Sequence, residues 1–134
     1  MFYGISIKES IMTECIIVGI GGFIGAVCRY LIGLIPLKEG CVFPIKTFII
    51  NAAGCFLIGM IAALAVKTNW LNPKAVLFLK VGICGGFTTF SSFALETGGL
   101  IEDGRMNIAV LYAVLSVAAG VIAVFAGQGI IKKI

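Results

Sequence analysis

Four long apolar stretches, joined by short polar connections, dominate this chain of 134 residues. They cover about residues 15–35, 43–66, 75–99 and 106–131. Each is close to the roughly 20 apolar residues that a helix needs to cross a bilayer. Because backbone polar groups must be satisfied inside lipid, such segments are expected to be helices. The chain is therefore predicted to be one all-α integral membrane domain, residues 1–134, with four transmembrane helices.

The composition excludes several function classes. Hydrophobic residues make up 60% of the chain and charged residues 12%, against roughly a quarter charged in soluble domains. A soluble enzyme is therefore not expected. Histidine, the commonest metal ligand and proton carrier near neutral pH, is absent from the sequence. A net charge of +4, spread along the chain, does not favour a nucleic-acid partner.

The glycine-rich stretch at 19–25 lacks the spacing and the preceding strand of a dinucleotide-binding loop, so no nucleotide partner is expected. Gly21 and Gly25 instead form a GxxxG pattern, which lets helices approach closely. The five cysteines stand far apart in the sequence, which favours packing roles over a metal cluster.

Lysine and arginine are divided only weakly between the two ends of the spans. One side would carry Lys8, Lys67, Lys74, Lys80, Lys132 and Lys133, and the other Lys38, Lys46, Arg105 and Arg29. This bias either modestly favours termini inside or indicates a protein that inserts both ways. Four spans are few to enclose a pathway, so a homo-oligomer is expected.

Polar residues inside apolar spans are costly, and they are usually kept for a reason. Arg29, near the end of the first span, either extends to the interface or attracts anions. Thr47 and Asn51 share one face of the second span. The Asn51 amide offers two N–H donors and an acceptor, so it either joins two helices or lines a pathway.

The third span contains the segment Gly85-Gly86-Phe87-Thr88-Thr89 near its middle. Paired glycines and paired threonines are poor helix formers, so the segment predicts a break. Irregular backbone at this depth is tolerated only inside protein or beside a cavity. Its carbonyl groups are hard oxygen donors for a small cation. A simple kink without an ion is the alternative.

Beyond the predicted break, Phe90 and Phe93 face the same way, and Ser91 and Ser92 add hydroxyl groups. Phenyl rings have positive edges, so two rings turned edge-on can coordinate an anion. Simple packing of the two rings is the alternative. Glu96 is expected either to cap a neighbouring helix or to pair with Arg29.

Tyr112 and Ser116 lie four residues apart in the fourth span, where they form either a polar track or bonds between helices. Taken together, the polar groups inside the spans are mostly uncharged hydrogen-bond donors. No ring of acids, as expected for a cation pore, is present. The pattern favours a pathway for a small anion such as fluoride, chloride or formate.

The segment Gly85-Gly86-Phe87-Thr88-Thr89-Phe90-Ser91-Ser92-Phe93 resembles the GGxTTFSTF signature of the Fluc (CrcB) fluoride channels. Cys28-Arg29-Tyr30 and Asn51-Ala52-Ala53-Gly54 are similar to other marks of that family, and the resemblance covers nearly the whole chain. It implies passive export of cytoplasmic fluoride, which protects the cell from fluoride toxicity. The location implied is a bacterial-type plasma membrane.

The resemblance also implies an antiparallel, dual-topology homodimer in the lipid membrane, with two fluoride pores. A structural Na⁺ at the dimer centre would be held by the backbone carbonyls of Gly85 and Thr88. Asn51 matches the family's pore asparagine, and Phe90 and Phe93 match its paired pore phenylalanines. The positions that match its polar-track, pore-lining or vestibule groups are Thr47, Glu96, Tyr112, Ser116 and, in the vestibule, Arg29.

Two residues depart from the family pattern: Ser92 stands where threonine is usual, and Gly120 where some members have serine. An alternative function is a small proton-coupled multidrug exporter, which also has four spans and dual topology. Glu14 would be its acid. However, Glu14 lies where the first span is expected to start and is read as a helix cap, and the third-span break has no use in that mechanism.

Overall fold

The computed structural model describes residues 2–36, 40–67 and 71–134, with side chains from residue 9 onward. The elements are α1 (Phe2–Gly33), α2 (Ile45–Lys67), α3 (Pro73–Val76), η1 (Leu77–Cys84), α4 (Gly85–Phe87), α5 (Phe90–Glu102) and α6 (Met106–Lys133). No strand occurs within these described ranges. The helices form four apolar spans long enough to cross a membrane, which confirms the predicted fold class and a multi-pass membrane protein.

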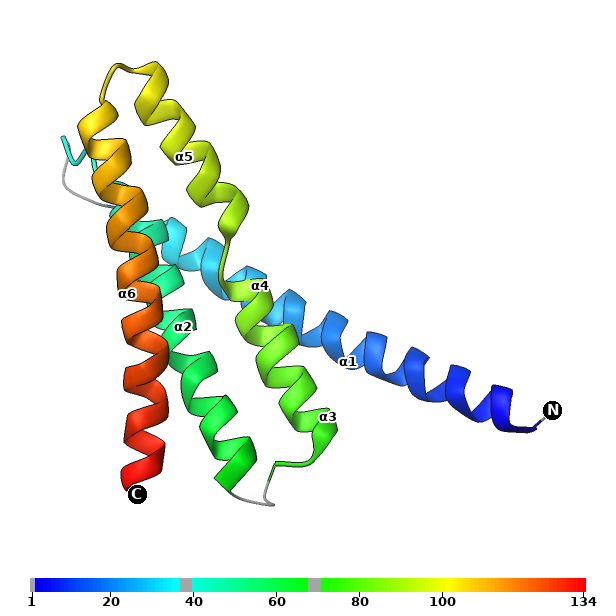
Figure 1. The fold of residues 1–134 in the computed structure, drawn as a ribbon. Coiled ribbons are helices and arrows are strands. Elements are labelled where there is room, and N and C mark those ends of the chain that lie inside the picture. Colours follow the sequence, from blue (N-terminus) through cyan, green and yellow to red (C-terminus); the bar gives the residue numbers. More distant parts are fainter. Residues whose placement is uncertain (1, 37–39, 68–70) are drawn as a thin grey trace.

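In Figure 1, α2 and α6 run side by side, and α1 crosses behind the third span before its N-terminal half extends away from the other helices. The helix α1 starts at Phe2, well before the predicted span. Glu14 therefore lies inside α1 and accepts a hydrogen bond from the Ser10 hydroxyl at 3.3 Å. The expectation that Glu14 caps a helix start is wrong, because the helix continues beyond its apolar part.

The third span is broken near its middle, as predicted. Pro73 starts the helix, and the side chain of Asn72 caps it by accepting from the Ala75 N–H at 2.8 Å. Helical geometry ends at Phe87 and resumes at Phe90. The stretch Leu77–Cys84 is a π-helix, which nothing in the sequence pattern predicts. Such segments are uncommon, and they occur frequently near functional sites.

Glycines allow α1 to lie directly against the first half of the third span. A methyl group at Gly25 would meet the Ile83 carbonyl oxygen, and one at Gly86 would meet the Gly22 carbonyl oxygen. One at Gly21 would lie 2.7 Å from the carbonyl oxygen of Phe78. The two backbones therefore touch, and this contact fixes the position of α4 just before the break.

The helices α2 and α6 also pack through small residues. A methyl group at Gly59 would meet the Val124 carbonyl oxygen, and one at Gly127 would meet that of Phe56. A small buried cluster forms between α5 and α6, where Tyr112 packs with Leu100 and Ala109. These close contacts place the end of α5 against the first half of α6.

The α1 contact yields a stability prediction. Gly25→Ala places a methyl group against backbone that cannot move aside, so unfolding free energy should fall by about 1–3 kcal/mol. Gly19→Ala on the same helix is the matched control, because nothing lies within 4 Å of its added methyl group. Thermal unfolding of the purified protein in detergent measures both variants. Equal melting temperatures for Gly25→Ala and Gly19→Ala would contradict the prediction.

Candidate functional site

The break at Thr88 and Thr89 redirects the hydrogen bonds of the third span. Both residues have extended backbone angles, with ψ of 158° and 116°. In a continuous helix the N–H groups of Thr89 and Ser92 would donate to the carbonyls of Gly85 and Thr88. Here the Thr89 N–H donates to Asn51 Oδ1 at 2.7 Å, and the Ser92 N–H donates to Thr89 Oγ1 at 3.1 Å. The break therefore withdraws the helical donors from the Gly85 and Thr88 carbonyls.

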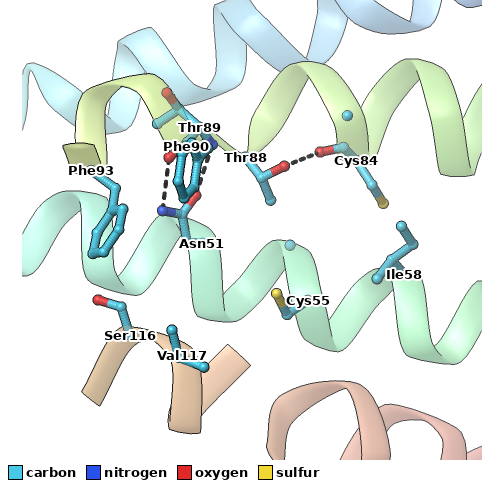
Figure 2. Close-up of a pocket in the computed structure, with 12 residues that line it drawn as sticks. Asn51, Cys55, Ile58, Cys84, Thr88, Thr89, Phe90, Phe93, Ser116 and Val117 are labelled. Atoms are coloured by element: carbon cyan, nitrogen blue, oxygen red, sulfur yellow. Dashed lines mark hydrogen bonds between the residues drawn. The ribbon is translucent and has the colours of Figure 1, made fainter. Parts of the chain in front are cut away.

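Asn51 of α2 closes the break from the side. Its Oδ1 accepts from the Thr89 N–H, and its Nδ2 donates to the Thr89 carbonyl oxygen at 3.0 Å (Figure 2). The amide thus pairs with both backbone polar groups of one residue, as a neighbouring strand would. An amide nitrogen carries two N–H donors, and this pairing uses one of them.

Thr88 and Thr89 stabilise the helix ends on each side of the break. The Thr88 hydroxyl donates to the Cys84 carbonyl oxygen at 2.9 Å. Thr89 is the N-cap of α5, and its hydroxyl lies 3.0 Å from Ser92 Oγ and 3.2 Å from Ser91 Oγ. Threonine is a favourable N-cap because its oxygen accepts an otherwise unpaired helix N–H.

One cavity of about 310 Å³ adjoins the break and opens to the surface of the chain. Among its lining residues, Figure 2 shows Thr88 and Thr89 above Asn51, and Phe93 above Ser116. Its lining residues are Asn51, Gly54, Cys55, Ile58, Cys84, Gly85, Thr88, Thr89, Phe90, Phe93, Ser116 and Val117. The cavity brings the predicted amide, phenyl and hydroxyl groups together, and its lining contains no charged side chain.

Phe90 and Phe93 begin a row of aromatic rings. Their centroids lie 5.6 Å apart, and Phe90 is 79% exposed, whereas Phe93 packs on Tyr112 at 5.1 Å. Phe43 contacts Tyr112 edge-on at 5.2 Å and continues the row to Phe48. The sequence pattern did not predict a role for Phe43 and Phe48, whose only signal is that both lie close to Pro44 at the start of α2.

Glu96 of α5 joins three helices. Its Oε1 accepts from the Thr47 hydroxyl of α2 at 2.7 Å, and its Oε2 accepts from the Tyr112 hydroxyl of α6 at 2.8 Å. Thr47 is almost fully buried, and Tyr112 is completely so. Tyr112 lines neither cavity in this single chain. It contacts residues that do line them, through its hydrogen bond to Glu96 and its ring contact with Phe93. Two hydroxyl donors satisfy a carboxylate that would otherwise be expensive at this depth.

A second cavity, of about 400 Å³, is also lined by Thr89. Its lining residues are Arg29, Tyr30, Gly33, Leu34, Lys46, Thr47, Ile50, Thr89, Ser92 and Glu96. Arg29 donates from Nε to the carbonyl oxygen of Gly86 at 3.2 Å, one residue beyond Gly85. Glu96 and Arg29 line the same cavity, but each is hydrogen-bonded to other partners. The expected pairing of Arg29 with Glu96 is therefore not seen in the structure.

The structure thus distributes the predicted residues over two cavities, which share Thr89 as a lining residue. Asn51, Phe90, Phe93 and Ser116 line the first, and Thr47, Ser92, Glu96 and Arg29 line the second. Gly85 and Thr88 line the first cavity, where a methyl group added at Gly85 would contact nothing within 4 Å. Ser91 lines neither cavity, and Gly21 and Gly25 lie in the α1 contact.

Comparisons with known proteins agree on one family. Residues 16–128 match the family described as CrcB-like protein, Camphor Resistance (CrcB). The chain is similar to the fluoride-specific ion channel FluC of Chlorobaculum tepidum, with 47% identity over 122 residues, which cover 91% of this chain and 97% of the relative. FluC of Azobacteroides pseudotrichonymphae is 41% identical over 117 residues, covering 87% and 94%. FluC of Rhizobium meliloti is 39% identical over 122 residues, covering 90% and 98%.

The pairing of Asn51 with Thr89 yields a prediction about the break. Asn51→Leu leaves both polar groups of Thr89 without their partner, which should lower unfolding free energy by about 2–4 kcal/mol. The Thr89 amide should also exchange with deuterium faster than in the wild type. Asn107→Leu, at an exposed position in α6, is the matched control. Unchanged Thr89 exchange in Asn51→Leu would show that the amide does not hold the break.

Proposed function

This chain belongs to the CrcB family, and on that premise we propose that it is a fluoride-specific ion channel, through which cytoplasmic fluoride leaves down its electrochemical gradient. Hydrogen fluoride enters cells as a neutral acid and releases fluoride in the more alkaline cytoplasm. A passive exit protects the cell from fluoride toxicity without nucleotide hydrolysis. The protein is accordingly a transporter in the cell membrane, and not an enzyme.

The chemistry of the first cavity is the observation that carries this function. An anion entering the membrane must exchange its hydration shell for other donors. The second N–H of the Asn51 amide, the Ser116 hydroxyl and the edges of Phe90 and Phe93 are donors of that kind. Carboxylates, which would repel fluoride, do not line this cavity.

The multidrug-exporter alternative has no comparable support. Its proposed acid, Glu14, is exposed on α1 and bonded to Ser10, and it lines neither cavity. Family membership points the same way, since the matched relatives are named fluoride-specific ion channels.

The working unit that we propose is an antiparallel homodimer whose subunits insert in opposite orientations. The weak division of lysine and arginine between the two ends of the spans supports dual topology. Ser116 supports the dimer, because its hydroxyl is buried and has no hydrogen-bond partner within the described chain. A buried polar group without a partner is costly. Ser116 lines the first cavity, so we expect its missing partner to come from outside the single chain.

A structural Na⁺ at the dimer centre is part of the same proposal. The carbonyls of Gly85 and Thr88 have lost their helical donors to the Asn51 and Thr89 side chains. Carbonyl oxygens released in this way suit a small hard cation. The open space beside Gly85 leaves room for a ligand shared between two copies. The ion would brace the break, while fluoride follows the walls formed by Asn51 and the phenyl rings.

The channel function is tested with purified protein in liposomes loaded with fluoride, with chloride-loaded liposomes as the specificity control. Wild-type protein should release fluoride, and chloride release should be at least about 100-fold slower, because an interior of fixed dipoles does not adapt to the larger ion. No fluoride release, or equal release of the two halides, would refute the proposal.

The same assay tests the phenyl rings. Phe90→Leu and Phe93→Leu remove the positive ring edges, so each should slow fluoride release at least about tenfold, since one lost aromatic contact corresponds to roughly 1.4 kcal/mol. Phe125→Leu is the matched control, because Phe125 lies exposed on α6 outside both cavities. A normal rate in the Phe90→Leu, Phe93→Leu double variant would exclude the rings from the pathway.

The sodium proposal is tested by exchanging Na⁺ for a bulky organic cation such as N-methyl-D-glucamine. Removal should lower both the melting temperature and the fluoride flux, because an ion that binds only the folded dimer stabilises it by mass action. Re-addition of Na⁺ should restore both. Thermal stability and flux that do not depend on Na⁺ would contradict the ion site without affecting the fluoride pathway.

A further inference from the structure

The second cavity contains a cationic side chain that neither the family resemblance nor the sequence pattern marks as functional. Lys46 lies in the first turn of α2, one residue before Thr47, and it lines the cavity together with Arg29. It is half-buried, and its Nζ donates to the Gly33 carbonyl oxygen at 2.6 Å. Gly33 is the last residue of α1, so the lysine joins the end of one span to the start of the next.

The charges of Lys46 and Arg29 are not matched by carboxylate partners. Lys46 is anchored by the Gly33 carbonyl, and Arg29 by the Gly86 carbonyl. Glu96, the acid in the same cavity, uses its two oxygens to accept from hydroxyl groups. Carbonyl oxygens orient a cation without neutralising it. The cavity therefore presents two positive groups against one carboxylate that is already satisfied.

The donor capacity of both cations also exceeds what these contacts use. An ammonium group has three N–H donors and a guanidinium has five, and each group has one contact to a backbone carbonyl here. The remaining donors lie at a cavity that touches Thr89, the residue shared with the first cavity. Two cationic groups and one carboxylate leave the cavity with a net positive charge, which raises the local concentration of anions.

We propose that Lys46 is a second anion-gathering residue of this channel, acting with Arg29 to concentrate fluoride at the cavity that leads to Thr89. The inference rests on the proposed function as a fluoride channel and deepens it. Lys46 acts on the approach of the ion, through its charge, and takes no part in replacing the ion's hydration at Asn51 or the phenyl rings.

The competing explanation is purely structural, because a cation at a helix C-terminus stabilises that helix. The chain supplies a matched control for this role. Lys67, at the opposite end of α2, donates from Nζ to the Ile131 carbonyl oxygen near the end of α6 at 3.0 Å. It makes the same kind of contact, but it lies outside both cavities. Loss of the cap alone should therefore affect Lys46 and Lys67 variants alike.

The experiment compares initial fluoride release from liposomes containing wild type, Lys46→Met, Lys46→Gln, Lys46→Arg or Lys67→Met. Each is measured at low and high concentrations of an impermeant salt. At low salt, both neutral Lys46 variants should be about threefold slower than wild type, the effect of one charge acting over several ångströms of water. The deficit should shrink below about 1.5-fold at roughly 1 M salt, where the Debye length is about 3 Å. Lys46→Arg and Lys67→Met should match wild type at both concentrations.

Two results would overturn the inference. A deficit of equal size at low and high salt, or one shared by Lys67→Met, would assign Lys46 the structural role only. Wild-type rates in both neutral variants at low salt would remove Lys46 from the pathway. Absence of fluoride release from the wild type would instead refute the proposed function itself, and this inference with it. Melting temperatures of all variants separate slow transport from poor folding.

Discussion

Backbone polar groups inside a membrane need partners, and this requirement organises the molecule around Thr88 and Thr89. Lipid offers no hydrogen bonds, so a break in a spanning helix persists only where side chains replace the lost backbone contacts. The Asn51 amide does so for both polar groups of Thr89, and the Thr89 hydroxyl does so for the Ser92 N–H. The carbonyls that lose their donors in this exchange are the ones with which the family resemblance associates a cation.

The remaining helices hold the two halves of the broken span in place from opposite sides. Close contact of α1 through Gly21 and Gly25 fixes the first half. Glu96 fixes the second half, because its carboxylate accepts from both α2 and α6. Thr89 lines both cavities as a consequence of these constraints. Packing, polar satisfaction and the proposed ion route therefore depend on the same few contacts.

The two cavities differ in the charge of the side chains that line them. The first, beside the break, is lined by neutral donors and phenyl rings and has no formal charge. The second is lined by Arg29 and Lys46, each anchored by a backbone carbonyl, and by the Glu96 carboxylate. Cationic side chains at the approach to a pathway raise the local concentration of anions there.

The sequence by itself determined the four spans, the break in the third and the identity of most polar groups at the cavities. These properties depend on local composition: apolar length, adjacent glycines and threonines, and four-residue spacing on one helix face. Only the tertiary structure decided that Asn51 pairs with Thr89, that Glu96 binds Thr47 and Tyr112 instead of Arg29, and that Phe43 and Lys46 join the site. Each of those contacts links residues on different helices, and helix periodicity specifies which face a residue occupies but not which neighbour that face meets. The extension of α1 to Phe2 escaped prediction for a related reason, since hydropathy marks where a helix can lie in lipid and not where its backbone hydrogen bonds begin.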